Sequence, residues 1–266
     1  MITKRLGVLG AIAILPAFAQ ASSAPTSMET IAPRQHGPIR GLMDHGDGMA
    51  ATENWSGYAV LGTSFTSAYA SWIVPTATCS SGNQYAAFWV GLDGYNSGTV
   101  EQTGTSSDCV GSQPNYYAWY EFYPQPSFVI GSLTITPGDH MAATVVYNGS
   151  EFTVTIKDET TGKAFRRSSA VSGAQRSSAE WIAEAPCCTA VGGILPLADF
   201  GTVLFGDDST GVAYTCDAVD SSTKGPIGVF PTIEEITMVT NGGVIEAIPS
   251  GLSGDGKSFS VTWAAK

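Results

Sequence analysis

The chain has 266 residues, and its 12 basic and 23 acidic side chains give a formal net charge of −11. This balance excludes nucleic acid as the main partner, because phosphate binding needs a basic surface. Apolar residues make up 43% of the chain and charged residues only 13%, a composition that excludes intrinsic disorder and is typical of a well-packed secreted β protein.

The N-terminus has the pattern of a secretory signal peptide. Lys4 and Arg5 precede an apolar run over residues 6–17, and Ala19-Gln20-Ala21 forms a small-residue cleavage site. The run is too short to span a bilayer, and no later stretch is long and apolar enough to do so. We therefore predict a signal peptide over residues 1–21 and a secreted, extracellular protein with no membrane partner. An uncleaved signal anchor is the alternative.

Residues 22–51 are rich in Pro, Ser, Met and His and show no period of 2 or 3.6 that could bury one face. We predict a prosegment there, with a flexible tail as the alternative. Arg34 and Arg40 lie in this segment, whereas residues 51–266 retain 8 basic against 20 acidic side chains. A basic prosegment could therefore lie on an acidic mature domain and act as its own inhibitor.

Residues 52–266 contain no linker or internal repeat, so we predict one domain. Short segments with β-branched or aromatic alternation follow one another, separated by turn residues such as Asp93-Gly94 and Asn241-Gly242. The expected strands are 57–61, 68–74, 85–92, 116–123, 141–147, 152–157, 179–184, 233–240 and 259–263. No long helical period occurs. The sequence therefore predicts an all-β, antiparallel, two-layered fold.

Cysteine and histidine limit the chemistry that the domain can perform. The five cysteines, Cys79, Cys109, Cys187, Cys188 and Cys216, allow at most two intrachain bridges with one thiol left over, and they lack the spacing of a zinc site. Three histidines occur in the chain. His36 and His45 lie in the predicted prosegment, so a histidine-dependent mechanism in the mature domain would have to use His140. We expect no metal and no other cofactor.

Carboxylates and amides are then the remaining catalytic candidates. Glu121 lies in the aromatic segment 116–123, where a charged group among rings is unusual. Glu180 and Glu184 point to one face of the strand expected at 179–184, but about 13 Å apart, too far for a close pair with each other. Gln102 follows a turn-rich segment, and its amide could steady an oxyanion.

Seven segments, taken in order, resemble the glutamic peptidase (eqolisin) family. They are residues 54–57, 70–76, 88–94, 101–104, 118–124, 179–184 and 198–203. This resemblance implies a β-sandwich of two curved antiparallel sheets, similar to concanavalin A-like jelly rolls. It also implies a pepstatin-insensitive acid endopeptidase that is made with a signal peptide and a prosegment removed at acid pH, and whose substrates are proteins and peptides.

The resemblance also implies site residues. The family's catalytic glutamine falls on Gln102, and its glutamate falls on Glu184, with Glu180 as the alternative. Other family cleft positions fall on Trp55, Trp89, Asp93 and Glu121, and we take these residues and Glu180 as expected substrate-binding positions. Relatives carry acidic residues after the Gln-Thr-Gly motif and before Ala-Trp-Tyr-Glu, where this chain has Thr105-Ser106 and Tyr117. The acidic network around the site is therefore expected to be thinner.

From these residues we expect Glu184 to act as a general base on a water held between it and Gln102. The Gln102 amide would then stabilise the tetrahedral oxyanion. Two alternatives use the same scaffold. One is a glycoside hydrolase with Glu121 and Glu184 as its pair of carboxylates. The other is a non-catalytic, lectin-like binding module. Nothing in the sequence indicates an oligomer interface, so we expect a monomer.

Overall fold

The computed structural model describes residues 30–187, 193–221 and 223–265, so the predicted signal peptide lies outside the described residues. Strands account for almost all regular structure, and the helical elements of the described residues are the single turn α1 (Asp207–Thr210) and the 3-10 turn η1 (Ile227–Val229). Within those ranges no helix has the length and apolar character needed to cross a bilayer. The predicted all-β class is confirmed.

One sheet carries most of the segments that the sequence analysis singled out. In spatial order its strands are β2 (Met43–Gly46), β3 (Met49–Thr52), β17 (Ile233–Val239), β4 (Trp55–Leu61), β13 (Ser178–Glu184), β6 (Ala87–Leu92), β7 (Val100–Val110), β8 (Gln113–Tyr123), β9 (Phe128–Val129) and β1 (Thr30–Ile31). All these pairings are antiparallel except that of β3 with β17, which is parallel.

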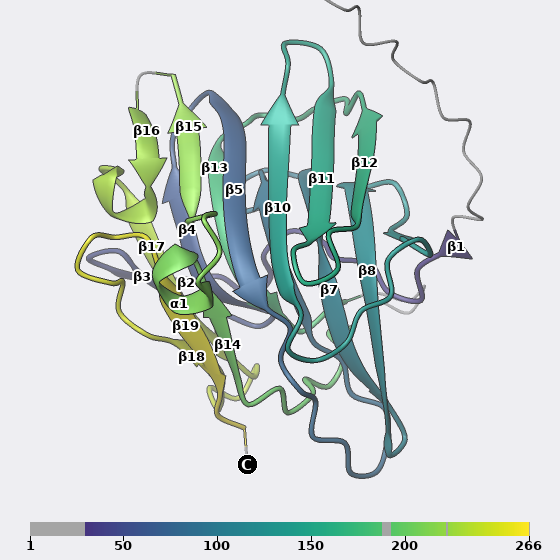
Figure 1. Ribbon diagram of the computed structural model, residues 1–266. Coiled ribbons are helices and arrows are strands. Elements are labelled where there is room, and N and C mark those ends of the chain that lie inside the picture. The colour runs from purple at the N-terminus through teal and green to yellow at the C-terminus, as the bar shows by residue number, and fades with distance from the viewer. Residues whose placement is uncertain (1–29, 188–192, 222, 266) are drawn as a thin grey trace, which may run out of the picture.

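The second sheet packs against the first (Figure 1). Its spatial order is β12 (Ala164–Ser169), β11 (Phe152–Asp158), β10 (His140–Tyr147) and β5 (Phe65–Ile73). Beyond β5 lie β15 (Asp217–Asp220) with β16 (Thr223–Pro226), and β14 (Thr202–Phe205) with β19 (Phe259–Trp263). The remaining strand, β18 (Ile245–Pro249), pairs with both β17 and β19 and so joins the two sheets at one edge.

Strand alternation divides the first sheet into two different faces. On β6, Phe88 and Val90 join the main core between the sheets, where they meet residues such as Trp72 of β5. Ala87 and Trp89 point the other way and join a second cluster that contains Trp55, Trp119 and Ile182. We call the surface that carries this second cluster the site face. It belongs to the first sheet and faces away from the second.

The nine strands expected from alternation are present with small differences at their ends. Among the strands that alternation did not predict is β7, an 11-residue strand with the sequence VEQTGTSSDCV. Polar residues dominate this strand, yet all but its last residue are buried. Buried polar side chains hide the alternation that marks an ordinary half-exposed strand. Gln102, which follows a turn-rich segment in the sequence, therefore lies inside a central strand.

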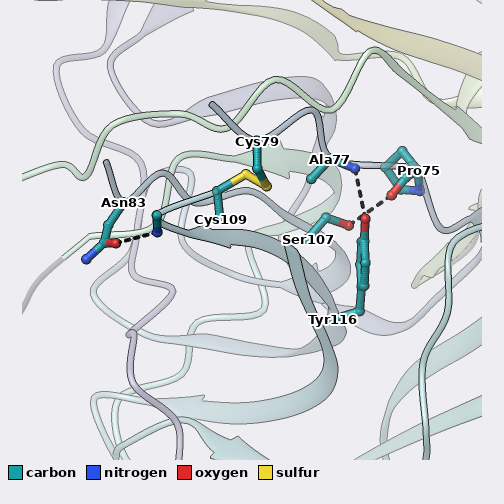
Figure 2. Close-up of a disulfide and its surroundings, with 8 residues drawn as sticks. Pro75, Ala77, Cys79, Asn83, Ser107, Cys109 and Tyr116 are labelled. Carbon is teal, nitrogen blue, oxygen red and sulfur yellow. Dashed lines mark hydrogen bonds between the residues drawn. A yellow bond between two sulfur atoms is a disulfide. The ribbon is translucent and has the colours of Figure 1, made fainter. Parts of the chain in front are cut away.

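A disulfide ties the long connection between β5 and β6 to the far end of β7. Cys79 and Cys109 are bonded, 30 residues apart in sequence, while Cys216 is free and buried. Figure 2 shows the hydrogen bonds around the bridge: the Tyr116 hydroxyl accepts from the amide of Ala77 at 3.1 Å, and Ser107 donates to the carbonyl of Pro75 at 3.2 Å. Cys187 is also disulfide-bonded. Cys188 lies outside the described residues.

Candidate active site

A row of side chains crosses the site face at the level of Gln102. The register pairs Glu180 with Gly91, Gly91 with Gln102, and Gln102 with Glu121. Directly paired residues in antiparallel strands point to the same face, so all four share it. A Cβ added at Gly91 would lie 2.9 Å from the Trp89 ring and 3.3 Å from the Gln102 Cβ. Glycine therefore leaves room beside Gln102 for the Trp89 ring.

Glu184 lies at the end of β13, on the same face as Glu180. It pairs with Trp55 on one side and Ala87 on the other. The indole N–H of Trp89 donates to Glu184 Oε2 at 2.9 Å, and Trp55 packs edge-on against Trp89 with ring centroids 5.0 Å apart. Two tryptophans thus hold the Glu184 carboxylate in a largely apolar wall.

His36 joins these groups into one hydrogen-bonded cluster. Its Nδ1 lies 2.9 Å from Glu184 Oε2, and its backbone N–H donates to Glu121 Oε2 at 2.8 Å. The Gln102 side-chain amide donates to the carbonyl oxygen of His36 and also reaches Glu121 Oε2 at 3.3 Å. The imidazole stacks on Trp119 with centroids 3.6 Å apart. Gln102 and Glu184 therefore contact the same residue of an extended peptide.

Residues 32–40, which we call the cleft segment, cross the site face on either side of His36. On one side, the amide of Cys187 donates to the Gln35 carbonyl at 3.2 Å, and Arg34 lies 3.9 Å over the Tyr85 ring. On the other side, Asn54 fixes the segment twice: its Nδ2 donates to the Pro38 carbonyl, and its Oδ1 accepts from the Arg40 amide. These are main-chain contacts of the kind that hold an extended peptide in a groove.

Burial changes the acidity of the carboxylates in this cluster. Burial raises the pKa of Glu121 well above its usual value, and the charge of Glu184 raises it further, against the opposing effect of the His36 amide. Burial also raises the pKa of Glu184, although His36 and the Trp89 hydrogen bond favour its charged form. Both carboxyl groups therefore titrate above the usual range for glutamate, which favours proton exchange at the site.

A second acidic group lies at the Glu180 end of the row. Burial raises the pKa of Glu101 to about 9, and it raises that of Glu180 well above its usual value, in both cases with a contribution from Asp93. Asp93 itself accepts hydrogen bonds from the backbone amides of residues 175–177. Its carboxylate thus holds the loop that leads into β13. The predictions that Asp93 and Glu180 bind substrate stay predictions.

Three residues at this site were not identified as functional from the sequence. His36 was assigned to the prosegment. Trp119 was not predicted as a site residue, although it lies two residues before Glu121 on β8 and therefore points to the same face. The third is Asp108, which is buried and accepts a hydrogen bond from the Tyr117 hydroxyl at 3.0 Å. Burial raises its pKa to about 7. The carboxyl group of Asp108 therefore lies beside Tyr117, where the sequence had suggested a thinner acidic network.

Among residues 30–187, 193–221 and 223–265 no group of three or more His, Cys, Asp or Glu side chains is arranged to hold a metal ion. The site consists of one amide, several buried carboxyl groups and a wall of indole rings. Such a set can move a proton and stabilise an oxyanion.

Comparisons with known proteins agree with this geometry. The model of the Peptidase A4 family matches residues 53–230. The chain is 30% identical to aspergillopepsin-2 of Aspergillus niger over 178 residues, 58% of this chain and 62% of that protein. It is 35% identical to scytalidopepsin B of Scytalidium lignicola over 137 residues, 49% and 51% of the two chains. It thus matches less than two thirds of either relative's length.

A solved structure extends the likeness over most of the chain. The crystal structure of scytalido-glutamic peptidase with a transition state analog inhibitor is 26% identical, has a TM-score of 0.67, and is covered over 98% of its length by 80% of this chain. The predicted β-sandwich is thereby confirmed, as is the resemblance to the glutamic peptidases. Family match, relatives and fold together establish that this chain belongs to the Peptidase A4 family.

Proposed function

We propose that this protein is a secreted acid endopeptidase that hydrolyses peptide bonds with the pair Gln102 and Glu184. One observation carries the proposal: the Gln102 amide donates to the carbonyl oxygen of a peptide, at His36, while Glu184 contacts the same residue from the neighbouring part of the site face. Membership of a peptidase family and the predicted signal peptide support it.

In the proposed reaction, a water molecule lies between Glu184 and Gln102 after the cleft segment has left. Ionised Glu184 takes a proton from this water, whose oxygen attacks the scissile carbonyl carbon. The Gln102 amide donates to the resulting oxyanion. Protonated Glu184 then passes its proton to the departing nitrogen as the carbon–nitrogen bond breaks. The raised pKa of Glu184 makes its ionised carboxylate a stronger proton acceptor for this water.

The other site residues have supporting roles in this proposal. Trp89 orients Glu184 through its indole N–H, and Trp55 packs on Trp89. Glu121 accepts the backbone N–H of the bound residue, which makes it the substrate-binding group nearest the reaction. Glu180 and Asp93 lie further along the site face, and we propose that they shape the cleft on that side.

We also propose that the prosegment inhibits the enzyme in place. The imidazole of His36 contacts Glu184 Oε2, and the Gln102 amide is occupied by the His36 carbonyl. His36 is fully buried, so substrate cannot reach the pair while the cleft segment is bound.

The glycoside hydrolase and lectin-like alternatives receive no comparable support. Glu121 and Glu184 both contact His36, and the groups around them donate to and accept from peptide backbone. A sugar site would use side chains that match hydroxyl groups on both sides of a glycosidic oxygen.

The test is proteolysis of an unfolded protein from pH 2 to 7 with pepstatin present. We expect wild type to cut only in the acid range, Glu184→Gln to lose activity, and Glu180→Gln to retain most of it. If Glu180→Gln lost activity and Glu184→Gln kept it, the general base would be Glu180. Cleavage of polysaccharide but not of protein by the processed wild type would contradict the proposal.

A further inference from the structure

We infer that the activating cut in this chain falls in the exposed strand β2, between Leu42 and Gly48, and that a second copy of the chain makes it. The inference rests on the proposed peptidase function and concerns how the site is uncovered. It differs from the boundary at residue 51 expected from the sequence. The cut would separate the cleft segment from the domain and leave β3 in place.

The cleft segment itself is a poor target for its own catalytic pair. The His36 carbonyl lies at the Gln102 amide, so the bond to Gly37 occupies the place of a scissile bond. However, Glu184 Oε2 is already shared between His36 Nδ1 and the Trp89 indole, both at 2.9 Å. The side chain of the bound residue thus lies against the Glu184 carboxylate, where the attacking water would have to enter. The peptide bond between His36 and Gly37 is therefore held in the site but protected from hydrolysis.

Exposure changes abruptly just after the cleft segment. His36 and Gly37 are buried and residues 38–40 are half-buried, whereas every residue from 41 to 47 is exposed. Leu42 and Met43 keep 41% and 44% of their surface accessible, which makes them two of the exposed large apolar side chains of the described chain. A peptidase cuts where the backbone can be reached, so this stretch is the accessible part of the segment.

The pairing of β2 is weak on one side and open on the other. Its bridges are Met43 to Ala51, Asp44 to Ala50 and Gly46 to Met49, with a register shift before the last pair. Among the described residues β2 has no second partner strand, and Figure 1 places it with β3 beside β17. A short edge strand of this kind can leave its sheet at low cost and present an extended backbone.

The next strand is fixed in the domain. β3 pairs in parallel with β17 from Met49 to Thr52, and Ala50 to Thr52 are buried. The Thr52 hydroxyl donates to the carbonyl of Trp55 and accepts from its amide. A cut C-terminal to Met49 would have to pull a buried strand out of the first sheet, so the boundary between removable and retained chain lies before Met49.

The occupied site favours a cut made by a second molecule. While the cleft segment fills a molecule's own site, its β2 cannot enter that site, so the first cuts come from a copy whose segment has already left. The reaction adds water across one peptide bond: the carbonyl carbon gains the hydroxyl and becomes a carboxyl group, and the nitrogen gains a proton and becomes a new N-terminus.

The experiment uses the full Glu184→Gln chain as substrate and a trace of acid-processed wild type as enzyme, with new N-termini read by mass spectrometry. We expect the first new terminus between residues 43 and 48, at a rate proportional to added wild type. A first cut within residues 32–40 or after Met49 would overturn the inference, as would a rate independent of added enzyme.

Proline substitution supplies the matched control. Met43→Pro with His45→Pro should slow the cut at least tenfold, because proline restricts the backbone yet is tolerated on an edge strand. Gly254→Pro, in an exposed turn where an added Cβ meets open space, should not slow it. Equal rates for the two variants would overturn the inference.

A second arm separates this inference from the proposed function. Brief pepsin treatment of the Glu184→Gln chain should cut first between Leu42 and Gly48, and first cuts elsewhere would overturn the inference. Cleavage of an unfolded protein by acid-treated wild type tests the proposed function independently. Suppose that wild type fails to cleave the unfolded protein while pepsin cuts within β2. In that case β2 is the accessible segment, but processing by a second copy of the chain is excluded.

Discussion

The two faces of the first sheet carry different kinds of side chain on the same strands: one face is apolar, and the other carries buried polar groups. Toward the second sheet, Phe88 and Trp181 pack in an apolar core. Toward the site face, the same two strands carry Trp89 and Glu184, with Glu184 Oε1 buried and without a hydrogen-bond partner among the described residues. Buried polar atoms are normally paired because leaving them unpaired costs stability. The core face therefore maintains the fold, and the site face keeps reactive groups at the expense of stability.

The largest expected effect comes from removing Gln102, the proposed oxyanion donor on the site face. Gln102→Ala should lower kcat about 10³-fold, because one preorganised donor contributes about that much to transition-state stabilisation. The midpoint of thermal unfolding should change little. Gln113→Ala, on an exposed position of the neighbouring strand, is the control. A Gln102→Ala enzyme with near wild-type kcat, measured on a short peptide, would refute the role of this face.

The core face should respond in the opposite way. Phe88 is fully buried and packs on Phe200 with centroids 5.2 Å apart, so Phe88→Ala should lower the free energy of unfolding by about 3–5 kcal/mol. Its neighbour Trp89→Phe should cost less stability but lower kcat, since it loses the indole donor to Glu184. Urea titrations and kcat measurements on both variants check this contrast, which fails if both change the same quantity.

The buried carboxyl groups make stability depend on pH. Glu101 has its pKa raised to about 9 in the folded chain, so between its ordinary pKa and pH 9 the folded state binds more protons than the unfolded state. The contribution of Glu101 to the free energy of unfolding is complete below about pH 4. It declines as pH rises, by about 3 kcal/mol up to pH 7.

Thermal unfolding from pH 3 to 8 measures this decline. The midpoint should be highest in acid, and Glu101→Gln should flatten the curve. Glu151→Gln, at an exposed position, should leave it unchanged. A midpoint that rises toward neutral pH would contradict the raised pKa values.

A smaller effect is expected from the residue that covers the site. His36→Ala removes the contact with Glu184 and the stack on Trp119, so the unprocessed chain should cut a short peptide about tenfold faster than unprocessed wild type. His140→Ala is the control, because His140 lies on β10 in the second sheet. Equal activity of the two unprocessed variants would show that His36 does not hold the segment.

Alternation and turn residues predicted the strands whose two faces differ in polarity, such as residues 179–184. They could not predict β7, because its polar residues are buried on both faces. Part of the candidate site could be named from the sequence: the family resemblance singled out Gln102, Glu121 and Glu184, and all three contact His36. His36 was missed because its contacts span 85 residues to Glu121 and 148 to Glu184. No local pattern encodes a contact of that range.

The most direct test of the account uses a synthetic peptide of residues 32–40 against the processed enzyme. If the site face binds extended peptide between Gln102 and Glu184, this peptide should inhibit competitively, raising KM for a short substrate and leaving kcat unchanged. The same peptide with His36→Ala should inhibit at least tenfold more weakly. Equal inhibition by both peptides, or a fall in kcat with constant KM, would contradict the account.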